Sequence, residues 1–131
     1  MDITPLYASL LALLFVALSV RTLRLRKSLK IAIGDAGNPV LLRAMRVHSN
    51  FAEYVPLCLF LVFLVEINEA NALVVHGLGS CLLLGRLSHA FGVSQARENY
   101  VFRVFGMVMT FAVLVSASAF LLVCYAGKIA A

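Results

Sequence analysis

Four polar residues recur at the start of a long apolar segment, at spacings that suit a binding site. They are Arg43, Arg46, Asn50 and Glu53. At 3.6 residues per turn, steps of three, four and three residues place all of them on one stripe of a helix. The following residues, 57–65, carry no charge, so we expect the helix to enter a membrane, where an unpaired ionisable side chain costs about 3 kcal/mol. The stripe therefore predicts a buried ligand site.

The residue types of the stripe indicate the chemistry of the ligand. Guanidinium groups bind carboxylates through paired hydrogen bonds, whereas Glu53 would bind an ammonium group and Asn50 an amide. Glutathione carries all of these groups together with a thiol. An arginine beside the thiol would favour the thiolate, since lowering a thiol pKa by two units needs about 2.7 kcal/mol. We expect Glu53 to be ionised and paired with arginines of its own stripe, a neutral and packed carboxyl group being the alternative.

Further polar residues lie at a similar depth in the predicted membrane. Tyr54 adjoins the stripe, and the end of the third apolar segment and the start of the fourth carry residues spaced largely by threes, which are Arg86, His89, Arg97, Tyr100 and Arg103. A ring of interfacial arginines that binds lipid phosphates is an alternative explanation. It accounts for the arginines but not for Asn50 or Glu53.

The elements that must position these residues are membrane-spanning helices. The chain has 131 residues, of which 63% are hydrophobic and 13% are charged, and its mean hydropathy is +0.99. Helices are predicted over 5–25, 39–66, 72–92 and 95–126, each at least near the roughly 20 residues that cross a bilayer. We expect an all-α integral membrane protein with one four-helix transmembrane domain over residues 1–131. The net charge of +5 is attributed to topology and anionic lipids, and not to nucleic acid.

Several polar residues mark where these helices should begin. Thr4 precedes Pro5 and Asn38 precedes Pro39, which is typical of an N-cap followed by proline at the first helical position. Asn71 is the expected cap of the third helix. Ser94 is the expected cap of the fourth, with Glu98 in its first turn.

The cysteines do not indicate a metal or redox site. Cys58, Cys81 and Cys124 are isolated in apolar surroundings, and no Cys-x-x-Cys pair occurs. We expect them to be packing residues, and we predict no metal site.

The basic residues predict the orientation in the membrane. Ten of the eleven lysines and arginines surround the first and third connections, and Lys128 lies on the other side. By the positive-inside rule these connections are cytoplasmic, both termini point away from the cytoplasm, and the polar stripe lies on the cytoplasmic side. No retention signal is evident, which suits a bacterial inner membrane at least as well as an endoplasmic reticulum.

The pattern on the second helix resembles that of a known family. Arg46, Asn50, Glu53, Tyr54 and Pro56 stand in the arrangement R-x-x-x-N-x-x-E-Y-x-P. This arrangement is similar to that of the membrane-associated proteins in eicosanoid and glutathione metabolism (MAPEG), which include microsomal glutathione transferases, leukotriene-C synthase and microsomal prostaglandin E synthase. The resemblance extends over nearly the whole chain in length, number of spans and placement of charge.

The resemblance implies an assembly, a cofactor and an activity. It implies a homotrimer of four-helix protomers that binds glutathione between neighbouring subunits, and a lipophilic electrophile that arrives from the bilayer for transferase or peroxidase chemistry of the detoxification type. By position, Arg46, Asn50, Glu53 and Tyr54 would bind glutathione, with contributions from Arg86 and His89. Arg43, Arg97 and Tyr100 are further candidate binding residues. Arg103 is the candidate that stabilises the thiolate, and Arg97 is second.

Two positions depart from the family pattern. Val93 stands where family enzymes can carry tyrosine, and Ser49 stands where the prostaglandin enzyme has a further arginine. These departures count against eicosanoid chemistry more than against glutathione binding.

Two other functions remain as alternatives. One is a noncatalytic scaffold that binds glutathione or lipid. The other is a small four-helix multidrug transporter, but such transporters place an acid in the first span, and residues 6–20 contain none.

Overall fold

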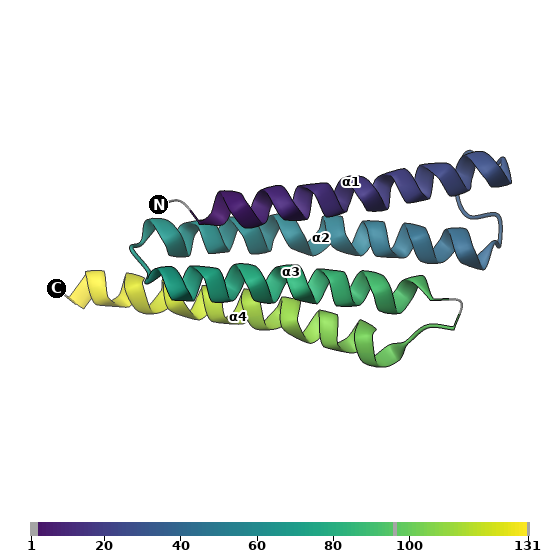
Figure 1. Ribbon diagram of the computed structural model, residues 1–131. Coiled ribbons are helices and arrows are strands. Elements are labelled where there is room, and N and C mark those ends of the chain that lie inside the picture. Colours follow the sequence, from purple (N-terminus) through teal and green to yellow (C-terminus); the bar gives the residue numbers. More distant parts are fainter. Residues whose placement is uncertain (1–2, 96, 131) are drawn as a thin grey trace.

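Four long helices make up the computed structural model, which describes residues 3–95 and 97–130. They are α1 (Thr4–Leu29), α2 (Pro39–Ile67), α3 (Ala72–Ser94) and α4 (Tyr100–Ala130) (Figure 1). Each is long and apolar enough to cross a membrane. The predicted all-α, four-helix integral membrane fold is confirmed.

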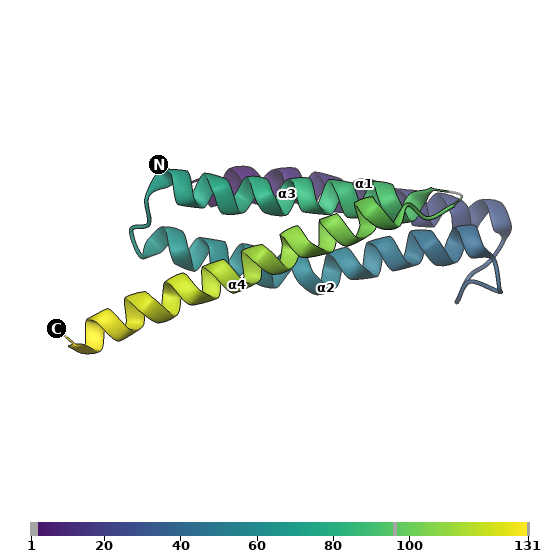
Figure 2. The same ribbon diagram turned by 90° about the horizontal axis from the view of Figure 1, so that it is seen from below.

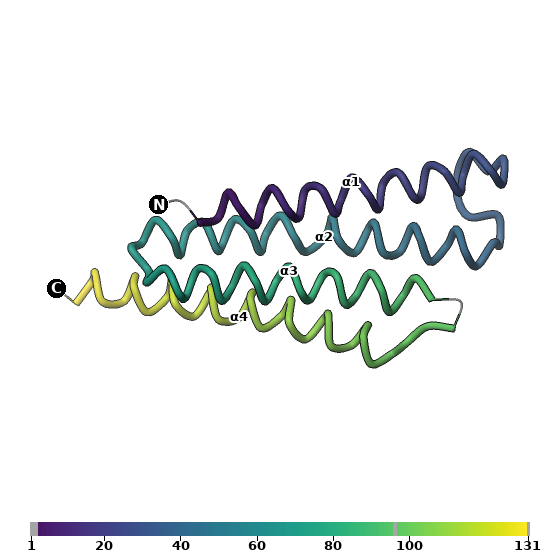
Figure 3. Tube along the Cα trace, viewed as in Figure 1, coloured from purple at the N-terminus to yellow at the C-terminus, as the bar shows by residue number. Residues whose placement is uncertain are grey.

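The helices run up and down, so the two basic connections lie together. One end of the bundle holds the connection from α1 to α2 and the connection from α3 to α4. The other end holds the start of α1, the turn from α2 to α3 and the end of α4 (Figure 3). α1 packs on α2 and α3, and α4 packs on α3 and α2. Seen from below, α4 runs obliquely to the other helices (Figure 2). The end with the basic connections is called the basic end below.

Asparagine side chains cap the N-terminal ends of α2 and α3, as predicted. Asn38 Oδ1 accepts hydrogen bonds from the backbone N–H groups of Val40 at 3.0 Å and Leu41 at 3.1 Å. Asn71 Oδ1 accepts from the N–H of Leu73 at 2.9 Å. Both caps satisfy donors that a helix start leaves free.

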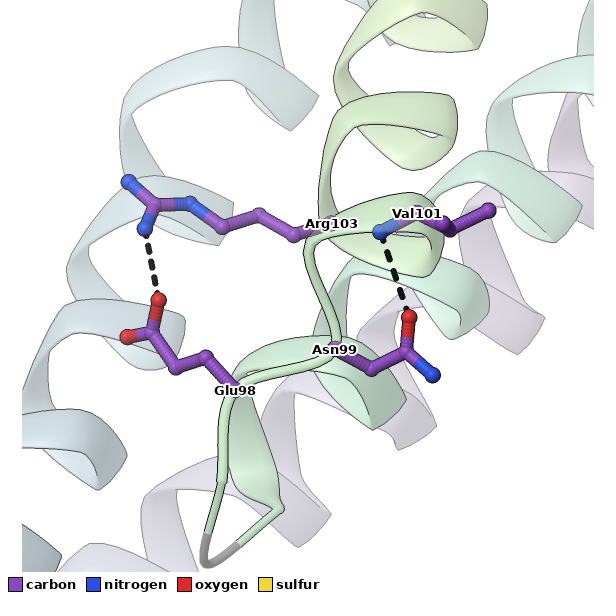
Figure 4. Close-up of polar contacts among 4 residues, drawn as sticks. All are labelled: Glu98, Asn99, Val101 and Arg103. Atoms are coloured by element: carbon purple, nitrogen blue, oxygen red, sulfur yellow. Dashed lines mark hydrogen bonds and ion pairs between the residues drawn. The ribbon is translucent and has the colours of Figure 1, made fainter.

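The predicted start of α4 is wrong. Ser94 is the last residue of α3, and α4 begins at Tyr100 rather than near residue 95. Asn99 is the cap, since its Oδ1 accepts from the N–H of Val101 at 3.2 Å and of Phe102 at 3.4 Å (Figure 4). The Ser94 hydroxyl cannot cap α4 because it lies at the end of α3, where it accepts a hydrogen bond from Arg21.

The start of α1 also differs from the prediction. The Thr4 side chain makes no capping hydrogen bond. Instead the Glu66 carboxylate, near the end of α2, accepts from the backbone N–H groups of Ile3 and Thr4, the latter at 2.9 Å. A carboxylate from another helix thus satisfies the donors at the start of α1.

Glycines allow α3 and α4 to approach closely beside the polar stripe. A Cβ atom on Gly106 would lie 2.6 Å from the backbone nitrogen of His89, and one on Gly85 would lie 2.9 Å from Met109 Cβ. Small residues are the usual means of such contact between membrane helices. The contact fixes the position of His89 relative to α4.

Replacing Gly106 with valine is therefore expected to destabilise the fold. Overpacking of this kind costs about 1–3 kcal/mol, so the thermal midpoint in detergent should fall. Gly127→Val on the same helix is the matched control, because nothing lies within 4 Å of its Cβ position. Equal midpoints for the two variants would contradict this account of the α3–α4 contact.

Candidate functional site

A cavity of about 450 Å³ opens at the basic end, between α2, α3 and the start of α4. Many of the predicted site residues line it, namely Arg43, Arg46, Asn50, Glu53, His89 and Arg103. Leu42, Ser49, Val93 and Glu98 complete the lining. The two positions that depart from the family pattern, Ser49 and Val93, thus belong to the same cavity.

The unbroken course of α2 places the polar stripe along one wall. The helix runs from Pro39 to Ile67 with Pro56 inside it, so the 3.6-residue period holds from Arg43 to Glu53. Arg46 and Glu53 are exposed, whereas Arg43 and Asn50 are half-buried. The stripe therefore presents two guanidinium groups, an amide and a carboxylate to one space.

The expected pairing of Glu53 is wrong within this chain. The ion pair found among the described residues joins Arg103 Nη1 to Glu98 Oε2 at 2.8 Å (Figure 4). Arg46 precedes Glu53 by seven residues, about 10 Å along a helix axis at 1.5 Å per residue, and no ion pair joins the two among the described residues. The exposed Glu53 carboxylate is therefore open to a cation from outside the helix.

Arg86 lies behind the cavity instead of in it, contrary to its predicted role in ligand binding. Its exposed fraction is 0%. Nη2 donates to Asn50 Oδ1 at 2.7 Å, and Nη1 lies 3.4 Å from Thr110 Oγ1. The guanidinium carbon lies 5.6 Å from the centre of the Phe51 ring, a favourable cation–π distance. Arg86 therefore supports the cavity wall from the interior of the bundle.

Three other predicted residues lie away from the cavity. Tyr54 is half-buried and packs edge to face on Phe111, with 5.6 Å between ring centres. Arg97 and Tyr100 are exposed, and neither lines the cavity. Their predicted roles in ligand binding therefore have no support from the cavity of this single chain and stay predictions.

Glu98 was missed as a site residue by the sequence analysis. Glu98 was predicted only to place a favourable negative charge in the first turn of α4. In the structure it precedes that helix and forms an ion pair with Arg103. The available signal was an acid five residues before the candidate arginine, on a connection expected to be short. Its carboxylate accepts a hydrogen bond from Arg103 Nη1 at 2.8 Å.

A second cavity, of about 560 Å³, lies between α1 and α2 and shares Leu42, Arg46 and Ser49 with the first. His48 lines it and contacts α1, with Nε2 at 3.0 Å from Ser19 Oγ and its ring stacked on Phe15. His48 therefore faces another helix, and it belongs to the packing of α1 on α2.

The chemistry of the first cavity suits a small molecule with charges of both signs. Arg43, Arg46 and Arg103 can bind carboxylates or another anion, and Glu53 can bind an ammonium group. Across residues 3–95 and 97–130 no group of three or more His, Cys, Asp or Glu could hold a metal ion. The described cysteines Cys58, Cys81 and Cys124 are free thiols, and Cys58 is buried.

The fold and the cavity together define a four-helix integral membrane protein with a charged, small-molecule-sized site at one end of its bundle. The model of the MAPEG family matches residues 4–123. The chain belongs to the MAPEG family, in agreement with the resemblance carried by the second helix.

Two curated relatives are similar to most of the chain. They are the inner membrane protein YecN of Escherichia coli strain K12 and its counterpart in E. coli O6:H1 strain CFT073. Each is 41% identical over 90 residues, which are 69% of this chain and 69% of the relative. This similarity reaches two thirds of both proteins and relates the chain to proteins of a bacterial inner membrane.

Proposed function

We propose that this protein is a glutathione-dependent membrane transferase that also supports peroxidase chemistry. The observation that carries the proposal is that Arg43, Arg46 and Arg103 line one cavity with Glu53, which has no ion pair among the described residues. Glutathione has two carboxylates, one ammonium group and a thiol, so its charges match this set. Membership of the MAPEG family supports the same ligand.

In the proposed reaction the protein supplies ionisation and orientation, and glutathione is the nucleophile. Arg103 would leave Glu98 and stabilise the thiolate, as an aimed guanidinium does for a developing anion. The thiolate sulfur then attacks the electrophilic carbon of a lipophilic substrate, a carbon–sulfur bond forms, and the leaving group departs with the electron pair of its bond. Holding both reactants in one site removes much of the entropic barrier.

We further propose a homotrimer with each site between neighbouring protomers. Glu53 and Arg46 are exposed at the side of α2, so a neighbouring subunit can complete the wall of the cavity. Membrane lipids would cover the remaining apolar surface and deliver the lipophilic electrophile. On the positive-inside rule we also propose that the site lies on the cytoplasmic side of an inner membrane, with both termini on the opposite side.

Calorimetric titration of glutathione into the detergent-solubilised protein tests this function. We expect saturable binding that is lost in the Arg46→Ala, Glu53→Gln double variant, because each substitution removes a charge-assisted interaction. A variant with Arg97→Ala and Glu69→Gln removes the same charges outside the cavity and should bind normally.

The outcome separates the proposed enzyme from the two alternatives. Binding with turnover of a lipophilic electrophile supports the transferase. Binding without any turnover supports a noncatalytic scaffold. Absence of binding by a well-folded oligomer contradicts the proposal, and loss of drug resistance in cells that carry Glu53→Gln would then indicate a transporter.

A further inference from the structure

Arg86 is a buried cation that has no ion pair to a carboxylate in the described parts of the chain. Its guanidinium group instead contacts side chains from three helices, Asn50 on α2, His89 on its own helix α3, and Thr110 on α4. Burial of a charge in a membrane protein is costly unless its donors find acceptors. Arg86 Nε has no hydrogen-bond partner within the described residues, whereas both terminal nitrogens do. These neighbours must therefore turn acceptor atoms toward Arg86.

The need of Arg86 for hydrogen-bond acceptors fixes the orientation of the Asn50 amide. An arginine side chain has five donors and no acceptor, so the atom of Asn50 that lies 2.7 Å from Nη2 must be the carbonyl oxygen Oδ1. Asn50 also lines the cavity. Its Nδ2 group makes no hydrogen bond within residues 3–95 and 97–130, so it is the donor left for a ligand.

The imidazole of His89 is constrained in the same way. Its Nδ1 lies 3.4 Å from Arg86 Nη2, and a proton on Nδ1 would point at a cation that can only donate. The proton of the neutral ring therefore belongs on Nε2. His89 lines the cavity although only 4% of it is exposed. Its Nε2 makes no hydrogen bond within the described residues, so this nitrogen is the one left to donate to a ligand.

Contacts from α4 and α2 hold Arg86 in this orientation. Thr110 Oγ1 donates to the backbone oxygen of Gly106 at 2.8 Å, which leaves its lone pairs for Arg86 Nη1 at 3.4 Å. The Phe51 ring supports the guanidinium plane at 5.6 Å. Because the Arg86 side chain can only donate hydrogen bonds, each polar neighbour must act as the acceptor in its contact with Arg86.

We infer that Arg86 is a positioning residue that makes Asn50 and His89 present only donors to the cavity, so that this part of the site takes an acceptor group, a carboxylate or a thiolate. The inference rests on the proposed function where it uses glutathione as the ligand. Without Arg86 the Asn50 amide could rotate and accept from a ligand N–H group. With Arg86 in place, a ligand that offers only donors is rejected.

The tautomer of His89 tests the inference without any ligand. Nitrogen-15 spectra of the histidine-labelled, detergent-solubilised protein should show His89 protonated on Nε2 alone, with the signal assigned by its loss in His89→Gln. In Arg86→Met this preference should be lost. A wild-type ring protonated on Nδ1 would overturn the inference, whether or not glutathione binds.

The Asn50→Asp variant tests the donor requirement. Aspartate is nearly isosteric and can pair with Arg86, so the thermal midpoint should not fall. However, its second oxygen replaces the amide donor, and glutathione affinity should fall at least about tenfold. Ser49→Asp adds the same charge to the cavity lining without touching Arg86 and is the matched control.

The comparison of these two variants decides the result. Weaker binding by Asn50→Asp than by Ser49→Asp supports the inference, and equal binding by the two contradicts it. If the unchanged protein binds no glutathione, the proposed function fails, and the spectrum of His89 still decides the role of Arg86.

Discussion

Replacing Arg103 with alanine is expected to lower the kcat of glutathione-dependent turnover by about 100-fold. Arg103 lines the cavity, and its ion pair with Glu98 leaves 45% of the arginine side chain and 27% of the glutamate side chain exposed. A guanidinium group beside the sulfur stabilises the thiolate, and alanine cannot replace it. Because exposed ion pairs contribute little to stability, the thermal midpoint should change little. Steady-state kinetics with a chlorodinitrobenzene electrophile would measure the effect.

Arg97→Ala provides the control for this prediction. Arg97 is exposed and lies outside the cavity, so its removal lowers the positive charge of the basic end without changing the site. Arg103→Lys should retain part of the activity, since lysine keeps the charge but not the planar fork. If Arg103→Ala and Arg97→Ala have the same kcat as the unchanged protein, Arg103 does not stabilise the thiolate.

Replacing Glu53 with glutamine is expected to abolish the preference for a ligand that carries a free ammonium group. The Glu53 carboxylate is exposed on the cavity and has no ion pair within the described residues. A hydrogen bond to a charged group contributes about 1.5–3 kcal/mol, so the unchanged protein should bind glutathione about 10- to 100-fold more tightly than N-acetylglutathione. Glu53→Gln should bind the two with similar affinity. Calorimetric titration with both compounds measures this ratio.

Glu69→Gln is the control, because Glu69 is an exposed acid in the turn between α2 and α3, at the end of the bundle away from the basic connections. It should leave the ratio of affinities unchanged. A Glu53→Gln variant that still discriminates against the acetylated compound would show that another group binds the ammonium.

The polar stripe could be predicted from sequence because it depends on one helix alone. α2 is continuous from Pro39 to Ile67, so residues three and four apart share a face whatever else the chain does. The caps at Asn38 and Asn71 were predictable for the same reason, since each acts on the residues that follow it. Helical periodicity and hydrogen bonds between near neighbours in the sequence were therefore sufficient to predict the stripe and the two caps.

The position of Arg86 could not be predicted in this way because it depends on contacts between helices. The threefold spacing places Arg86 and His89 on one face of α3, but it does not say that α4 covers that face through Gly106. The cap of α1 by Glu66 joins residues more than sixty positions apart. Neither arrangement leaves a periodic signal, so each became visible only when the helices were assembled.

The ion pair between Arg103 and Glu98 means that any anion binding Arg103 must compete with a carboxylate of the same chain. An incoming anion gains Arg103 only by displacing a carboxylate that is tethered a few residues away and is therefore always present at high effective concentration. A ligand that Arg43, Arg46 and Glu53 also hold, as proposed for glutathione, would compete better than a free ion. Under the proposed function, binding at Arg103 is therefore an exchange of one counter-ion for another, which favours molecules that the rest of the cavity also holds.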